Sequence, residues 1–200
     1  MKKTDYKWFY QADFLEDSLH SQLVESLSLG FKSGLFIDEE GTVTETQGNV
    51  VSNRYHDNSI LKSKVSKDTL LAIELIENKL IESGVKVPVL FNLSTLVGPR
   101  PTPDMKSYGW HKDFNIIDHI QDPLKLWFTM LTLTKNDVNS EFMVSPVSPT
   151  PEGPDFWKMG VRTVATSNKL FGHNMHLGHE YAPKENNNVC ILYMRWFDAG

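Results

Sequence analysis

Apolar residues near the start of the chain recur every three or four positions, as they do along the buried face of a helix. In the stretch DFLEDSLHSQLVESLSLG, residues 13–30, Asp13 and Glu16 have the spacing of a capping box. Gly30 can adopt the left-handed conformation that often ends a helix. This pattern predicts a first helix. Its apolar positions are Phe14, Leu15, Leu19, Leu23 and Leu27.

Residues 66–84 show the same periodicity more clearly. Ser66 is placed to cap the first turn, and Gly84 is placed to end the helix. The predicted apolar face is broad and contains Leu70, Leu71, Ile73, Leu75, Ile76, Leu80 and Ile81. Between the two helices, the polar residues 38–58 lack helical periodicity and predict a short hairpin or a loop.

Beyond residue 86 the pattern changes to short apolar runs that are separated by turn residues. The predicted strands are residues 87–97, 107–114, 124–133, 141–147, 161–167, 170–179 and 189–197. No helical pattern between them is long enough for repeated parallel crossovers, so an antiparallel jelly roll is favoured over a doubly wound sheet. The expected fold class is mainly β (α+β), in one domain: residues 1–85 form a helical and loop region that packs on a core formed by residues 86–200.

Composition and charge exclude several classes of function. The chain has 200 residues, of which 40% are hydrophobic, so it can bury one core. Its formal net charge is −5 and its Lys and Arg residues are not clustered, which argues against nucleic-acid and membrane-surface partners. Cys190 is the single cysteine, and the first residues lack the apolar run of a signal peptide. We therefore expect a cytoplasmic protein.

Two segments carry residues that can bind a metal ion. In YGWHKDF, His111 and Asp113 are two positions apart, so a strand would project both side chains from one face. The second segment, GHNMHLGHE, contains His173, His176 and His179. Two histidines and one carboxylate form the facial ligand set of non-haem Fe(II) oxygenases. The pattern favours a metal site that combines the first pair with a histidine of the second segment.

The last predicted strand, VCILYMRWF, is apolar in both of its alternating rows except at Arg195, which predicts burial on both faces. A buried guanidinium is costly unless it is paired with an anion, and arginine can bind a carboxylate through two parallel hydrogen bonds. Arg195 is therefore either a clamp for a dicarboxylate at the metal, or a structural residue that forms a salt bridge or reaches water at the strand end.

Together, WHKDF, then KLWFTMLTL followed by NSEFMVSPVSPTP, then LGHEYAPKENNNVCILYMRWF resemble the Fe(II)- and 2-oxoglutarate-dependent oxygenases, in particular the branch similar to phytanoyl-CoA dioxygenase. The resemblance covers residues 86–197 and implies a double-stranded β-helix (jelly-roll, cupin-like) core with flanking helices. His111 and Asp113 match the H-x-D ligands, and His179 matches the distal ligand, with His176 as the alternative. Arg195 is then the candidate for the residue that binds the C5 carboxylate of 2-oxoglutarate.

The place of Arg195 in the last strand both supports the match to the family and departs from it. Arg195 follows His179 by sixteen positions, an interval that suits a hairpin of two adjacent strands with the arginine near the metal. Many members of the family carry the arginine earlier in the last strand, near Asn188 or Val189 of this chain.

The resemblance implies Fe(II), 2-oxoglutarate as cosubstrate and O2. The implied reaction hydroxylates an unactivated C–H of a small molecule (an amino acid, sugar or specialised metabolite, free or tethered to a carrier), with release of succinate and CO2. Since Asp113 is a carboxylate, no coordination position is freed for a halide, and hydroxylation is favoured over halogenation.

Two other functions stay open at this point. The first is a cupin-like metalloenzyme that does not use 2-oxoglutarate and binds its metal through His111, His176, His179 and either Asp113 or Glu180. The second is a non-enzymatic jelly-roll binding module. Aromatic residues near the predicted strands either pack in the core or line a pocket: Tyr108, Trp110, Phe114 and Trp127.

Overall fold

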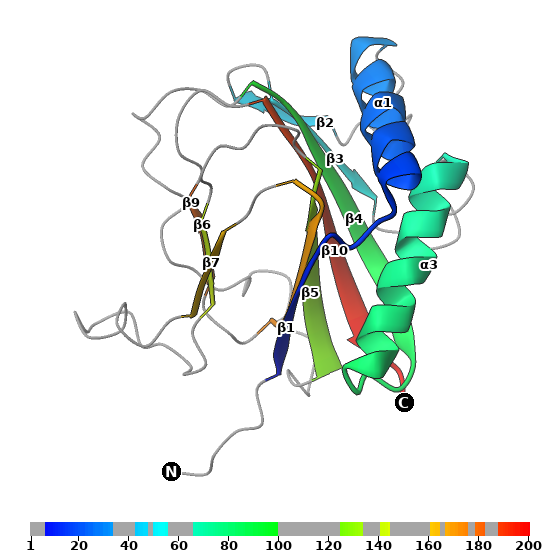
Figure 1. Ribbon diagram of the computed structural model, residues 1–200, viewed down its shortest axis with the longest axis vertical. Helices are drawn as coiled ribbons and strands as arrows, with labels where there is room; N and C mark the ends of the chain where they lie inside the picture. The colour runs from blue at the N-terminus through cyan, green and yellow to red at the C-terminus, as the bar shows by residue number, and fades with distance from the viewer. Residues whose placement is uncertain are drawn as a thin grey trace, which may run out of the picture.

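The structure is a computed structural model of the chain. It describes residues 7–33, 43–47, 50–55, 66–99, 125–133, 141–144, 161–164, 167–175, 179–182 and 188–200. Side chains are described for residues 7–27, 66–93, 125–133, 167–175 and 190–200. In this part of the chain a large sheet lies between two helices on one side and a small sheet on the other (Figure 1).

The large sheet has seven strands in the order β1–β8–β5–β10–β4–β3–β2, and the small sheet has three in the order β7–β6–β9. Every pair of neighbouring strands is antiparallel. The strands are β1 (Trp8–Ala12), β2 (Val43–Gln47), β3 (Val50–Tyr55), β4 (Pro88–Pro99), β5 (Leu126–Thr132), β6 (Glu141–Val144), β7 (Val161–Val164), β8 (Lys169–Asn174), β9 (His179–Ala182) and β10 (Asn188–Asp198). Two antiparallel sheets with helices outside one of them confirm the predicted jelly-roll fold class.

The helix α3 (Lys67–Glu82) forms as its sequence predicts. The hydroxyl oxygen of Ser66 accepts a hydrogen bond from the backbone N–H of Thr69 at 3.2 Å, and Gly84 ends the helix with a φ of 97°. The apolar face is narrower than predicted, because Leu71 and Ile81 are 45% and 50% exposed. The helix turns only one stripe of side chains toward the sheet.

The helix α1 (Asp17–Ser33) begins later than the predicted capping box and continues through Gly30. Asp13 has a left-handed φ of 48°, so it belongs to the bend before the helix and is not the N-cap. The predicted ends of this helix are therefore wrong at both sides. The predicted apolar positions Leu19, Leu23 and Leu27 are buried in the helix, and Leu15 is buried just before it.

The main core lies between the helices and the large sheet. One alternating row of β10 faces the helices and is fully buried; its members are Cys190, Leu192, Met194 and Trp196. Trp127 of β5 points to the same side, so it is a core residue and not part of a pocket on the other face. Phe9 packs against this core and stacks on Trp127 with 6.3 Å between ring centroids. Desolvation raises the pKa of Cys190 to about 12.

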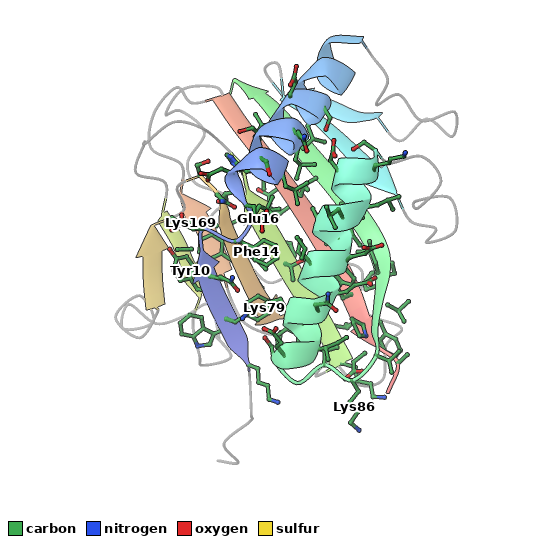
Figure 2. The ribbon with its side chains drawn as sticks, turned by 45° about the vertical axis from the view of Figure 1, so that its right-hand side comes forward. Tyr10, Phe14, Glu16, Lys79, Lys86 and Lys169 are labelled. Carbon is green, nitrogen blue, oxygen red and sulfur yellow. The ribbon has the colours of Figure 1, made fainter. Side chains whose placement is uncertain are left out.

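Residues before the predicted core also join the large sheet. The polar stretch 38–58 contributes the antiparallel pair β2 and β3, which confirms the predicted hairpin and places it at one edge of the sheet. Two strands were not predicted. Strand β1 forms the opposite edge by pairing with β8, and β9 begins where the predicted strand 170–179 ends. In Figure 2, Tyr10 of β1 lies beside Lys169, whose Nζ is 5.7 Å from the ring centroid.

In the described part of the chain, neither helix has the length and apolar character needed to span a membrane.

Candidate functional site

The large sheet has one face toward the helices and a second face, here called the inner face, on the side of the small sheet (Figure 1). Strand register aligns one residue from each of β4, β10, β5 and β8 across this inner face. Asn92 of β4 pairs with Arg195 of β10, Arg195 pairs with Phe128 of β5, and Phe128 pairs with His173 of β8. Since neighbouring strands lie about 4.8 Å apart, the row extends for about 14 Å. It places a guanidinium, an imidazole and an amide along one line.

Aromatic rings fill the space between these polar groups. The ring of Phe128 lies 5.1 Å from that of His173 and 5.8 Å from that of Tyr193, measured between centroids. One row further along, Phe171 contacts Tyr10 at 5.2 Å. An aromatic surface of this kind excludes water and strengthens the electrostatic interactions made beside it.

The two faces of β10 differ in their access to solvent. The row that faces the helices is buried, whereas Tyr193, Arg195 and Phe197 on the inner face are each partly exposed. The two apolar rows predicted burial on both faces. This is correct for the row that faces the helices and wrong for Tyr193, Arg195 and Phe197, which are partly exposed. Arg195 thus points toward the inside of the sandwich from the middle strand of the large sheet, at a position that solvent can reach.

Arg195 is oriented by its neighbour on β4. Its Nη1 donates a hydrogen bond to Oδ1 of Asn92 at 2.9 Å, and Asn92 is only 1% exposed. The acceptor is a neutral amide, so this hydrogen bond orients the guanidinium without cancelling its positive charge. An oriented guanidinium on an aromatic surface is suited to bind a carboxylate.

His173 is fully buried at the same level of the sheet. Its Nδ1 lies 2.9 Å from the backbone carbonyl oxygen of Asn174. A carbonyl oxygen can only accept, so Nδ1 carries the proton, and in the neutral ring Nε2 is then a hydrogen-bond acceptor. The ring is therefore held in one tautomer and one orientation.

Of the predicted metal ligands, His111, Asp113 and the alternative His176 lie outside the described residues. His179 is the first residue of β9 and pairs with Val144 of β6; its backbone is described and its side chain is not. Within the described residues, no three His, Cys, Asp or Glu side chains form a group that could hold a metal ion.

The strand directions place the ends of β8 and β10 at the same end of the large sheet. Strands β8 and β10 run in the same direction, because each is antiparallel to β5. Asn174 at the end of β8 and Arg195 near the end of β10 therefore share one end of the large sheet. His179 is five residues after Asn174, and five residues span at most about 17 Å.

The predicted hairpin between the histidine and the arginine strands is wrong. Strand β9 belongs to the small sheet and β10 to the large sheet, so the two are not hydrogen-bonded neighbours. In a jelly roll, consecutive strands can alternate between the two sheets, which brings their residues together across the sandwich. The proximity of His179 and Arg195 stays a prediction, and it would require packing of the two sheets because the two strands share no hairpin.

Sequence reasoning did not single out three members of the row. Asn92 belongs to no motif. Phe128 was noted only as part of a predicted strand, and His173 only as part of the histidine-rich segment. Strand alternation could have placed His173 on the same face as Phe171. No sequence signal would have placed Asn92 opposite Arg195, because the pairing depends on the register of two strands that are about 100 residues apart.

Comparison with known proteins supports the fold through structure and not through sequence. No protein-family model matches the chain, and no curated protein sequence matches it. Several solved structures match over nearly its whole length. One is a prolyl-4-hydroxylase from Pseudomonas putida, with a TM-score of 0.58, 14% sequence identity, and coverage of 97% of this chain and 93% of the other.

Two further matches have names that describe non-haem chemistry. The non-haem monooxygenase ThoJ, solved as a nickel complex, has a TM-score of 0.67 at 11% identity and covers 96% of this chain and 73% of the other. The epimerase SnoN, solved with Fe3+, α-ketoglutarate and nogalamycin RO, has a TM-score of 0.64 at 13% identity, with coverage of 96% and 79%. This chain has their fold. The double-stranded β-helix core predicted from the sequence, with helices outside it, is thereby established.

Proposed function

We propose that the protein is an Fe(II)- and 2-oxoglutarate-dependent dioxygenase, similar to the phytanoyl-CoA dioxygenase branch, that hydroxylates an unactivated C–H of a small molecule. The observation that carries the proposal is Arg195: a guanidinium oriented by a neutral amide, on the partly exposed inner face of this fold. Structures of the same fold include enzymes named as dependent on α-ketoglutarate.

The chemical types of the proposed residues match the groups that this reaction requires. Neutral imidazoles of His111 and His179 and the carboxylate of Asp113 form a donor set suited to Fe(II). Arg195 supplies the fork that a terminal carboxylate needs, and the rings of Phe128 and Tyr193 flank it with apolar surface. When bound, the iron and 2-oxoglutarate supply the oxidation of a substrate C–H, coupled to release of succinate and CO2.

The protein's own residues have three tasks in this proposal. Arg195 binds the C5 carboxylate and thereby orients the cosubstrate. The aromatic inner face keeps water away from the reacting groups. His111 and His179 bind metal only as neutral imidazoles, so metal affinity decreases as the pH falls and the rings are protonated. The substrate is proposed to be an amino acid, sugar or specialised metabolite, free or carrier-tethered.

The first experiment measures metal and 2-oxoglutarate binding, followed by succinate formation with Fe(II), ascorbate and O2. We expect one metal ion per chain, lost in His111→Ala, and 2-oxoglutarate binding that requires the metal. A metallated protein that does not bind 2-oxoglutarate would refute the proposal. The absence of stoichiometric metal binding would instead favour a jelly-roll binding module.

The variant Arg195→Met separates the proposal from a cupin-like enzyme that needs no 2-oxoglutarate. Methionine keeps much of the apolar volume and removes the charge. We expect metal binding to be retained and 2-oxoglutarate affinity to fall by about 10- to 100-fold, the cost of losing charged hydrogen bonds. The matched control is Lys79→Met, which removes a positive charge from the exposed ion pair with Glu82 on α3 and should leave both affinities unchanged.

A further inference from the structure

Asn92 lies where it can set the orientation in which Arg195 binds a carboxylate. The two residues are direct partners in the β4–β10 register, on the inner face of the large sheet. Oδ1 of Asn92 accepts a hydrogen bond from Nη1 of Arg195 at 2.9 Å. Asn92 is buried while Arg195 is partly exposed, so the amide holds the guanidinium from its protein side.

A β-bulge puts the amide in this position. The β4–β10 register shifts between Arg195 and Trp196: Arg195 pairs with Asn92, but Trp196 pairs with Leu90, which leaves Phe91 as the extra residue. Strict alternation would direct Leu90 and Asn92 to the same face. With the bulge, Leu90 packs in the core under the helices, and Asn92 remains on the inner face beside Arg195.

The chemistry of the amide suits a role in anion binding. An aspartate in the same position would form a partly buried salt bridge with Arg195 and neutralise the charge that attracts a carboxylate. Asparagine makes the same hydrogen bond as a neutral acceptor, so this bond orients the guanidinium and does not neutralise it. A pair that served only to join β4 to β10 would be at least as strong with an aspartate.

We propose that Asn92 is a positioning residue that aims the Arg195 guanidinium at the C5 carboxylate of 2-oxoglutarate. This inference rests on the proposed function. Asn92 acts through Arg195 and is not assigned a contact with the metal or with the reacting atoms. Substitution of Asn92 should therefore change the affinity for a dicarboxylate specifically, apart from any effect on folding or metal binding.

The decisive variant is Asn92→Asp. We expect it to fold and bind metal as the wild type does, because the charged Arg195 donor keeps its hydrogen bond and the acceptor becomes a carboxylate in place of a neutral amide. The KM for 2-oxoglutarate should rise by about 10- to 100-fold, with kcat much less affected, as for loss of a charged hydrogen bond. The inhibition constant of 2-oxopentanoate, which lacks the C5 carboxylate, should stay unchanged. A purely structural role predicts no such difference between the two ligands.

Two further variants complete the experiment. Asn92→Ala removes the acceptor but keeps the charge, so it should raise the KM for 2-oxoglutarate less than Asn92→Asp; it carries the test if the aspartate variant does not fold. The matched control is Thr129→Val on the helix-facing side of the same sheet, where Thr129 Oγ1 accepts a 2.9 Å hydrogen bond from Trp196 Nε1. It should lower Tm and leave the KM unchanged.

The outcomes distinguish this inference from the proposed function. If Arg195→Met weakens 2-oxoglutarate binding but Asn92→Asp and Asn92→Ala bind it like the wild type, the positioning role is refuted and the proposed function stands. If the metallated wild type does not bind 2-oxoglutarate, the proposed function is refuted, and the inference with it. A dicarboxylate-specific rise in KM in Asn92→Asp supports both.

Discussion

Asn168 joins the start of β8 to the segment that leads into α1. Its side chain makes two hydrogen bonds with the backbone of Leu15: Oδ1 accepts from the N–H at 2.8 Å, and Nδ2 donates to the carbonyl oxygen at 2.7 Å. Its own carbonyl oxygen accepts from the N–H of Phe14 at 3.1 Å. Asn168 has a left-handed φ of 57°, and both it and Leu15 are buried.

We predict that Asn168→Ala lowers the free energy of unfolding by about 3–7 kcal/mol. The substitution leaves two buried backbone groups of Leu15 without these partners, at about 1–3 kcal/mol each. It also puts alanine in a left-handed conformation, which costs about 1 kcal/mol. A loss of this size is a large part of the 5–15 kcal/mol that is typical of a domain.

Asp13→Ala is the matched control. Asp13 also has a left-handed φ, 48°, but its side chain is exposed. This variant should lose only the conformational cost of about 1 kcal/mol. The difference between the two variants then measures the hydrogen bonds of Asn168.

The assay is equilibrium urea unfolding of both variants, followed by circular dichroism and tryptophan fluorescence. A loss below about 1 kcal/mol in Asn168→Ala, or one equal to that of Asp13→Ala, would refute the reasoning. The whole loss would then come from the left-handed conformation, and the hydrogen bonds of Asn168 would contribute nothing measurable. Since β8 carries His173 and leads toward His179, we also expect the alanine variant to lose metal affinity at temperatures where the wild type retains it.

Three further predictions concern other parts of the sheet. A Cβ at Gly172 would overlap the ring of Phe9, so Gly172→Ala should lower stability by about 1–3 kcal/mol, and adding Phe9→Leu should restore part of the loss; no recovery would contradict the overlap. Cys190 is buried with its pKa raised to about 12, so at pH 8 it should react with a thiol reagent only after unfolding; labelling of the native protein would contradict its burial. The pKa of Asp198 lies below its ordinary value: desolvation would raise this pKa, but backbone hydrogen bonds to the carboxylate lower it by more. Its stabilisation should therefore be complete above about pH 4 and decline as the pH falls through the lowered pKa, and Asp198→Asn should flatten this acid limb of a pH-dependent unfolding series.

Local patterns predicted the features that depend on neighbouring residues. Helix α3 has its cap at Ser66 and its end at Gly84 because both effects act within one turn of the backbone. The alternation in β10 was also predicted, since one row packs under the helices and the other contains Arg195. Each of these follows from the period of a helix or strand and from the choice of residue at its ends.

The first helix shows where local patterns fail. Asp13 and Glu16 have the spacing of a capping box, yet Asp13 lies in a left-handed bend and α1 begins only at Asp17. The nearby backbone of Leu15 instead bonds to Asn168, which is 153 positions away in the chain. Two buried hydrogen bonds to a distant side chain outweigh a local cap whose contribution is about 1 kcal/mol.

The sequence by itself determined the class of fold and the two alternating rows of β10, and it predicted the residue types of a candidate metal site at His111, Asp113 and His179. Only the tertiary structure decided that β9 and β10 lie in opposite sheets, that Trp127 belongs to the core, and that a bulge sets Asn92 beside Arg195. The physical reason is the range of the forces. Periodicity and capping act over a few residues, whereas strand register and sheet packing are decided by hydrogen bonds and buried surface between segments that are distant in the chain.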